Sequence, residues 1–128
     1  MSSSAARPLW LARFIAPRHA LIDSAIEQWQ SVGEADTPAS DAHCRMYLAC
    51  AGPGSTRHIH AAAFAAYGPP VVIACIDWLC ERVQDTTVDD VRGIDLQAIE
   101  QALALSPRQR YAALLAIDAL ASALDNLG

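Results

Sequence analysis

Alternation of apolar and polar residues marks one strand clearly, between Cys44 and Cys50. The residues on one side of this segment are apolar or cysteine, and those between them include an arginine and a tyrosine, which is the period-two pattern of a half-buried strand. Residues 52–55, Gly-Pro-Gly-Ser, are turn residues, so residues 57–67 are expected to return as the partner strand of a hairpin.

The chain before this hairpin carries a weaker pattern. Residues 25–32 predict a further strand, although their alternation is poor. Residues 33–41 are rich in Asp, Thr, Pro and Ser and predict a loop. A short apolar helix over residues 8–15 is expected to stop before Pro17, because proline disfavours helical backbone in the residue that precedes it.

Helical spacing dominates the second half of the chain. Apolar residues recur three and four apart between Pro69 and Val83, and prolines are tolerated in a first helical turn. Thr87 can cap a short helix, Asp95 can cap a helix over residues 96–104, and Ser106 can cap the last one. Strands followed by helices indicate an α+β domain: a small antiparallel sheet of about three strands with helices packed on one face.

Length and charge limit the organisation and the partners of the protein. The 128 residues predict a disordered N-terminus over residues 1–8 and a single domain over residues 9–126. A net charge of −5 argues against nucleic acid as a partner, and no apolar run is long enough for a membrane span. Four cysteines without a signal-peptide pattern indicate reduced thiols and a cytoplasmic location.

Four short segments follow one another in a characteristic order. They are Ala16-Pro17-Arg18, then Phe64-Ala65-Ala66-Tyr67-Gly68, then Leu105-Ser106-Pro107, and finally residues 115–120, Leu-Ala-Ile-Asp-Ala-Leu. In this order and spacing they resemble the NifU/IscU-type iron–sulfur cluster assembly scaffolds. The resemblance extends from about Leu9 to Leu124 and implies the α+β fold of that family, with the second segment at its strand-to-helix junction.

The resemblance also implies where a cluster site would lie. The family holds its cluster with three cysteine thiolates, soft ligands suited to iron and sulfide, assisted by an aspartate two residues after the first and a histidine beside the third. The cysteine positions fall here at Ala39, Pro69 and Ala112, and the histidine position falls at Tyr111. Asp41 alone keeps the family residue. We therefore expect a vestigial site with no cofactor, no resident metal and no catalytic residue.

The cysteines and histidines that are present form no evident replacement site. Cys44 and Cys50 would lie about 20 Å apart along a strand, and Cys75 and Cys80 would point about 140° apart around a helix. All four are expected to be small buried residues. The pair in His58-Ile59-His60 could ligate a metal only with a third ligand. A metal-binding protein with relocated ligands, namely Asp41, Cys44 and the histidines, remains an alternative.

Two arginines, Arg108 and Arg110, fall in the first turn of the last helix, where the helix dipole disfavours cations. They are either solvated or kept to meet an acidic partner, which makes them candidate partner-binding residues. The family resemblance places a chaperone-recognition stretch here, from which residues 105–109 depart at three of five positions. We expect a non-catalytic accessory or protein-interaction factor linked to iron–sulfur cluster assembly. An unrelated α+β interaction module is the other alternative.

Overall fold

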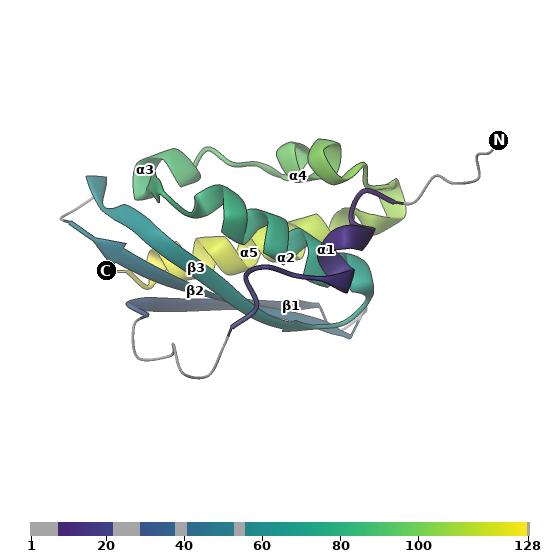
Figure 1. The fold of residues 1–128 in the computed structure, drawn as a ribbon, viewed down its shortest axis with the longest axis horizontal. Coiled ribbons are helices and arrows are strands. Elements are labelled where there is room, and N and C mark those ends of the chain that lie inside the picture. The colour runs from purple at the N-terminus through teal and green to yellow at the C-terminus, as the bar shows by residue number, and fades with distance from the viewer. Residues whose placement is uncertain (1–7, 22–28, 38–40, 53–55, 128) are drawn as a thin grey trace.

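The computed structural model describes residues 8–21, 29–37, 41–52 and 56–127 (Figure 1). The strands form one antiparallel sheet in the order β1-β2-β3-β4, and α2 and α5 lie across one of its faces with α3 and α4 beyond them. The elements are α1 (Leu11–Ile15), β1 (Ser31–Thr37), β2 (Ala42–Ala51), β3 (His58–Tyr67), α2 (Pro70–Val83), β4 (Thr86–Thr87), α3 (Val88–Val91), α4 (Leu96–Leu103), η5 (Pro107–Gln109) and α5 (Arg110–Asp125). Within the described residues no helix is long and apolar enough to cross a membrane.

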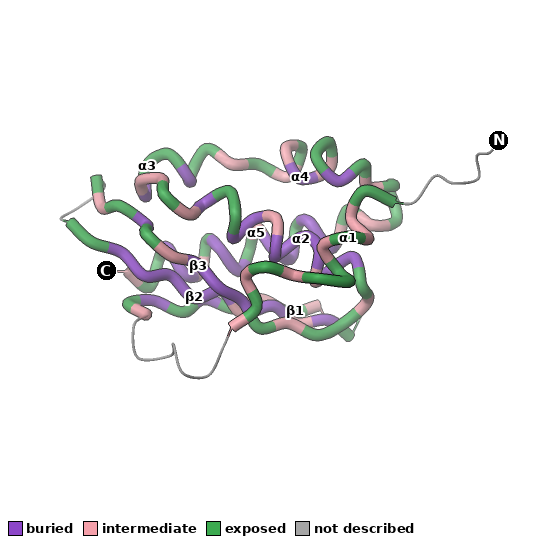
Figure 2. The backbone as a smooth tube through the Cα atoms, viewed as in Figure 1, coloured by how far each residue is buried: buried purple, intermediate pink, exposed green. Residues whose placement is uncertain are grey.

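The core lies between the sheet and the two long helices (Figure 2). Alternate residues of β2, among them Cys44, Met46 and Leu48, are fully buried against the helices. Met46 pairs with Phe64 of β3, so the inward faces of the two strands are in register. The predicted hairpin and the predicted orientation of its alternating residues are therefore confirmed.

Helix α5 packs closely on β1 because small residues meet there. A Cβ atom added to Gly33 would lie 2.0 Å from the backbone nitrogen of Ala123, so only a glycine fits between the strand and the helix backbone. The Ser31 hydroxyl donates a hydrogen bond to the Ala123 carbonyl, and Ser122 Oγ accepts the Glu34 N–H at 3.3 Å. These contacts fix α5 along the length of β1.

The sheet differs from the sequence prediction at its two edge strands, β1 and β4. The predicted loop over residues 33–41 is wrong for residues 33–37, which belong to β1. The predicted strand over residues 25–32 overlaps β1 only at its last two residues, and residues 25–28 lie outside the described part of the chain. A fourth strand, β4, pairs with His58 and Ile59. Two threonines give too short a segment for a periodicity to be seen.

The helix caps agree with the sequence. Thr87 Oγ1 accepts the N–H of Asp90 at 3.2 Å, and Asp95 Oδ1 accepts the N–H of Ala98 at 3.0 Å. At Ser106 the arrangement includes the reverse contact, in which Gln109 Oε1 accepts the Ser106 N–H at 2.9 Å. The chain then passes through η5 into α5. These polar residues thus set where α3, α4 and η5 begin, whereas α2 begins after Pro69 without a side-chain cap.

Candidate functional site

The candidate site is the end of the sheet where β1 and β3 finish and β2 begins. Asp41 directly precedes β2 and is exposed, and Pro69 follows β3 as the residue before α2. Gly68 joins them in space: a Cβ added to it would lie 2.8 Å from the Cβ of Ala42 and 3.6 Å from the Asp41 carbonyl oxygen. Its φ of +133° is a conformation that suits glycine. The structure therefore brings the Asp41 and Pro69 positions together.

The first two turns of α5 lie at the same end. Tyr111, Leu114, Leu115 and Asp118 line a cleft of about 190 Å³ together with Asp36 and Thr37 from the end of β1. Ala112 is fully buried, whereas Tyr111 is half-buried. Ala39, the remaining predicted position, lies outside the described residues. Four of the five predicted site residues can thus be placed, and all four lie at this end of the sheet.

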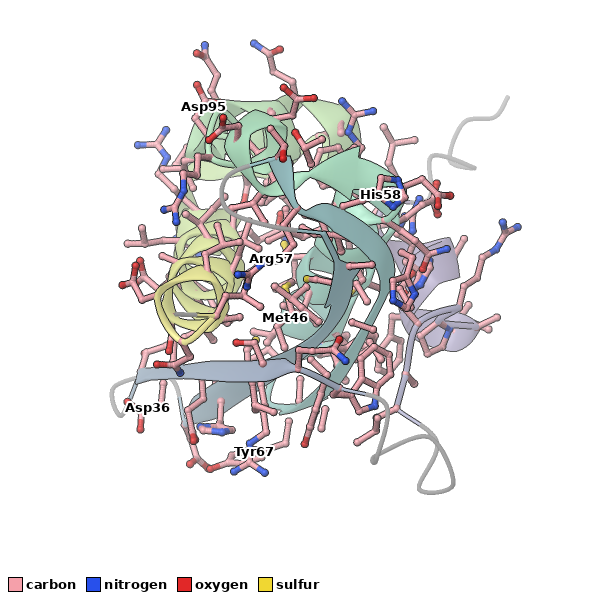
Figure 3. The ribbon with its side chains drawn as sticks, turned by 90° about the vertical axis from the view of Figure 1, so that its left-hand side faces the viewer. Asp36, Met46, Arg57, His58, Tyr67 and Asp95 are labelled. Atoms are coloured by element: carbon pink, nitrogen blue, oxygen red, sulfur yellow. The ribbon has the colours of Figure 1, made fainter. Side chains whose placement is uncertain are left out.

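A polar and aromatic cluster covers the outer face of the sheet beside this end. The rings of His43 and Tyr67 stack with centroids 5.6 Å apart and an angle of 20°. Glu34 Oε1 lies 3.2 Å from His43 Nε2 and 3.5 Å from Arg45 Nη2. In Figure 3, Tyr67 and Asp36 lie on the side of the sheet away from Met46, which points into the core. We call Glu34, His43, Arg45 and Tyr67 the outer-face cluster.

The sequence pattern alone does not predict the outer-face cluster. Its residues come from three strands, and the pairing of Glu34 with Arg45 and of His43 with Tyr67 depends on the register of both strand pairs. Alternation along β2 was the one available signal, because it places His43 and Arg45 opposite the buried Cys44. That signal predicts which face of the strand His43 and Arg45 occupy, but not which residues of β1 and β3 lie beside them.

Comparison with known proteins identifies the family. A sequence model of the NifU-like N terminal domain matches residues 9–127. The chain belongs to this family. The alternative of an unrelated α+β module is therefore wrong. No curated protein sequence matches the chain.

Solved structures share the NifU-like fold at low sequence identity. One is a proposed iron–sulfur cluster assembly scaffold protein for the SUF system of thermophilic Fervidobacterium islandicum AW-1. It has 15% identity and a TM-score of 0.70, over 97% of this chain and 99% of that one. Another is the N-terminal part of a nitrogen-fixing NifU-like protein from Brucella abortus, with 12% identity and a TM-score of 0.65 over 94% and 92% of the two chains. These likenesses establish the fold.

The described positions at which the family resemblance places ligand cysteines carry no thiol. Pro69 and Ala112 have hydrocarbon side chains, and Ala112 is inaccessible to solvent. Burial raises the pKa of the Tyr111 phenol, so this side chain remains a neutral hydroxyl. Asp41 contributes one exposed carboxylate. One carboxylate does not complete the four-ligand set that a cluster takes from a protein.

The four cysteines of the domain are held elsewhere, in the core. Cys44, Cys75 and Cys80 are fully buried and Cys50 is 8% exposed, and all four are free thiols. Burial raises the pKa of Cys44 and of Cys75 to about 12, and raises that of Cys80 as well. Neutral thiols are poor metal ligands and poor nucleophiles. The predicted burial of the cysteines is confirmed.

The alternative metal site is not assembled by the residues proposed for it. Cys44 faces the core, whereas its neighbour His43 faces the opposite side of β2. His58 and His60 are exposed and begin β3, at the strand end away from Tyr67. Within the described part of the chain, no group of three or more potential ligands lies close enough to hold a metal ion.

The two candidate partner-binding arginines differ in their surroundings. Arg110 begins α5, and its Nε donates to Glu100 Oε2 at 2.7 Å. Arg108 lies exposed in η5, with no ion-pair partner among the described residues. Arg110 is thus paired within its own chain across α4 and α5, a contact that the sequence did not reveal. Arg108 keeps its charge available.

Proposed function

We propose that this protein is a non-catalytic NifU-like protein that does not bind a cluster and acts through protein contacts in iron–sulfur cluster assembly. The observation that carries the proposal is the chemistry of the described ligand positions: Pro69 and Ala112 offer hydrocarbon, and Ala112 is closed to solvent. Thiols elsewhere in the chain do not compensate, because they lie in the core. A cytoplasmic location, where such thiols remain reduced, is part of the proposal.

The proposed contact surface is the solvent-facing side of the sheet at this same end. Tyr67 is 59% exposed and stacks on His43, and Arg45 lies beside it on the same face. Tyrosine and arginine are enriched in protein interfaces, because each provides a large contact area together with hydrogen-bonding groups. Arg108 provides a further free cation at the α4–α5 junction. We assign partner contact to these residues and not to Arg110, whose charge is engaged by Glu100.

Anaerobic reconstitution tests the loss of cluster binding. Tag-free protein, purified and kept without oxygen, is incubated with ferrous iron and sulfide, desalted, and analysed for visible absorption, iron and acid-labile sulfide. We expect no stoichiometric cluster. A stable visible band with about one cluster per chain or per dimer would contradict the proposal and direct attention to the core cysteines.

A variant that restores the three thiolates is the matched control. Ala39→Cys, Pro69→Cys and Ala112→Cys together with Asp41 would recreate the family ligand set, and zinc is a simple probe because it accepts tetrahedral thiolate and carboxylate ligands. Ala112 is buried, so the added sulfur is expected to cost about 1–3 kcal/mol of stability, and circular dichroism must show that the variant folds. A folded variant that binds zinc no better than the parent would show that the three positions do not converge.

A further inference from the structure

The segment before the sheet crosses α2 without entering the core. None of the residues 8–21 is buried (Figure 2), and Leu9, Phe14 and Ile15 are 60%, 37% and 65% exposed. Trp10 is half-buried and packs at the margin of the core. We call residues 8–21 the strap. Its apolar contact with the domain is small for a segment of this length, so other interactions must hold it in place.

The charged contacts of the strap centre on the carboxylate of Asp77 on α2. This side chain is fully buried. Its Oδ2 accepts a hydrogen bond from Arg13 Nη1 at 2.9 Å, and its Oδ1 accepts the backbone N–H groups of Arg18 and His19 at 2.8 Å each. All three donors belong to the strap. Charge-assisted hydrogen bonds of this kind are stronger than neutral ones, so Asp77 is the principal anchor of the strap.

Packing around the anchor is incomplete. A cleft of about 400 Å³ lies between the strap and α2, and Asp77, Arg13 and Glu81 are among the residues that line it. Arg13 reaches across it to Glu81, with Nη2 and Oε1 3.0 Å apart. Water would reach Asp77 and Arg13 as soon as the strap moved away. Undocking therefore leaves both charges in water. Breaking a buried ion pair is costly when one charge stays buried without a partner, and that cost does not arise here.

The far end of the strap pairs with the edge of β3. The Phe64 N–H donates to the His19 carbonyl at 2.9 Å, and the Leu21 N–H donates to the Phe64 carbonyl at 2.7 Å. Both polar backbone groups of Phe64 are thus satisfied by the strap and not by β2. Phe64 lies three residues before Tyr67, on the strand that leads into the candidate site. The strap covers the strand edge beside that site.

We propose that the strap is a releasable element: the Asp77 carboxylate keeps it docked, and its release uncovers the β3 edge while the sheet, α2 and α5 remain folded. An uncovered strand edge offers unpaired N–H and C=O groups to a further strand. The strap thus controls access to the edge of β3 next to the end of the sheet where a partner is proposed to bind. The docking and release of the strap do not depend on the proposed binding of a partner.

Asp77→Asn tests the anchor with little change of shape. The amide of the variant cannot accept charge-assisted bonds through both of its polar atoms, and its NH2 group would face the donors of the strap. Trypsin reports the result directly, because the chain has nine arginines and no lysine. The Arg13–Phe14 and Arg18–His19 bonds lie in the strap, whereas Arg82 lies in α2. Hydrogen exchange at the Phe64 amide is a second readout that does not depend on any arginine.

We expect cleavage at Arg13 and Arg18 and exchange at Phe64 to accelerate about tenfold or more, as the loss of one charged hydrogen bond implies. Cleavage at Arg82 and the helical circular dichroism should not change. Asp118→Asn, at an exposed carboxylate of α5, should behave as the parent. Unchanged strap cleavage and exchange in Asp77→Asn would overturn the proposal, and so would equal acceleration at Arg82.

Arg13→Gln provides a second test if Asp77→Asn does not fold. It removes the ion pairs of Arg13 with Asp77 and with Glu81 and leaves Asp77 with its two backbone donors. We expect faster cleavage at Arg18 and faster exchange at Phe64, by a smaller factor than in Asp77→Asn, with the domain folded. A variant whose strap is as protected as that of the parent, or one that unfolds as a whole, would refute release of the strap as a unit.

Discussion

Substitution of Gly33 by alanine tests how closely α5 is held to the sheet. A Cβ at this position would lie 2.0 Å from the nitrogen of Ala123, 2.5 Å from its Cα and 2.6 Å from the Ala119 carbonyl oxygen. All three are backbone atoms, so no side-chain rotation relieves the contact. To lengthen the shortest contact from 2.0 Å to the 3.4 Å of ordinary contact, α5 and β1 must separate by about 1.4 Å.

This separation would disturb the helix that carries part of the candidate site. It would weaken the hydrogen bond from Ser31 to the Ala123 carbonyl and that from the Glu34 N–H to Ser122. Forcing a methyl group into a packed interface costs about 1–3 kcal/mol, and the loss of a buried hydrogen bond adds about 1 kcal/mol. We expect Gly33→Ala to lower the free energy of unfolding by about 3 kcal/mol, which corresponds to a fall in Tm of roughly 10 °C for a domain of this size.

Urea unfolding followed by circular dichroism measures the effect. Gly93→Ala is the matched control, because the atom nearest to its added Cβ would be the Asp90 carbonyl oxygen at 3.5 Å, an ordinary contact. The control should change the free energy of unfolding by less than about 1 kcal/mol in either direction. If Gly33→Ala changes stability by no more than Gly93→Ala, α5 does not pack against β1 at this distance.

Three further predictions concern the thiols, one helix cap and the junction before α2. Burial raises the pKa of Cys44 and Cys75 from 9.0 to about 12, so these thiols stay neutral in the folded chain while the unfolded chain ionises. The free energy of unfolding should be insensitive to them below about pH 8.5 and fall between pH 9 and 12, by up to about 1.4 kcal/mol per thiol per pH unit. Urea titrations at pH 8 and 10 check this. The free energy of unfolding should fall less between these pH values in Cys44→Ala than in the parent, and an equal fall would contradict the prediction. Asp95→Ala removes a cap that accepts an N–H at 3.0 Å and should cost about 1 kcal/mol by the same assay; no loss would show that α4 does not depend on its cap. Pro69, with φ −56° and ψ 150°, fits its backbone without strain, so Pro69→Cys should lose about 0.5–1 kcal/mol and gain no zinc affinity; zinc binding by this single variant would mean that other ligands already converge on it.

Strand β1 shows where the reading of hydrophobic patterns fails. Its inward positions include Gly33 and Ala35, and its outward positions include Glu34 and Asp36. The inward residues are small because a helix backbone lies against them, and the outward residues are charged because solvent does. The strand therefore lacks the large apolar residues that made β2 recognisable. Without knowledge of the position of α5, a glycine in a segment of small and charged residues indicates a loop.

Some features of the candidate site can be predicted from neighbouring residues in the sequence, and others depend on the fold. Asp41, Pro69, Tyr111 and Ala112 could be placed by motif order, because each lies a fixed number of residues from a recognisable segment. The stacking of His43 on Tyr67 and the bonds around Asp77 could not, since they join residues from elements far apart in the chain. The local sequence around Asp77 does not indicate which residues it contacts. Its burial and its three donors became visible with the fold.

The cysteines show why the number of ligands in a chain does not decide whether a cluster can bind. This chain has four, one more than the family positions require. Cys44 is buried by the same register that buries Met46 and pairs it with Phe64. Shifting β2 by one residue would expose the thiol but would also move Met46 and every other inward side chain of the strand to the outer face. The core and a solvent-facing Cys44 are therefore mutually exclusive, so a cluster site built by substitution would need new cysteines at the end of the sheet and could not use the existing one in β2.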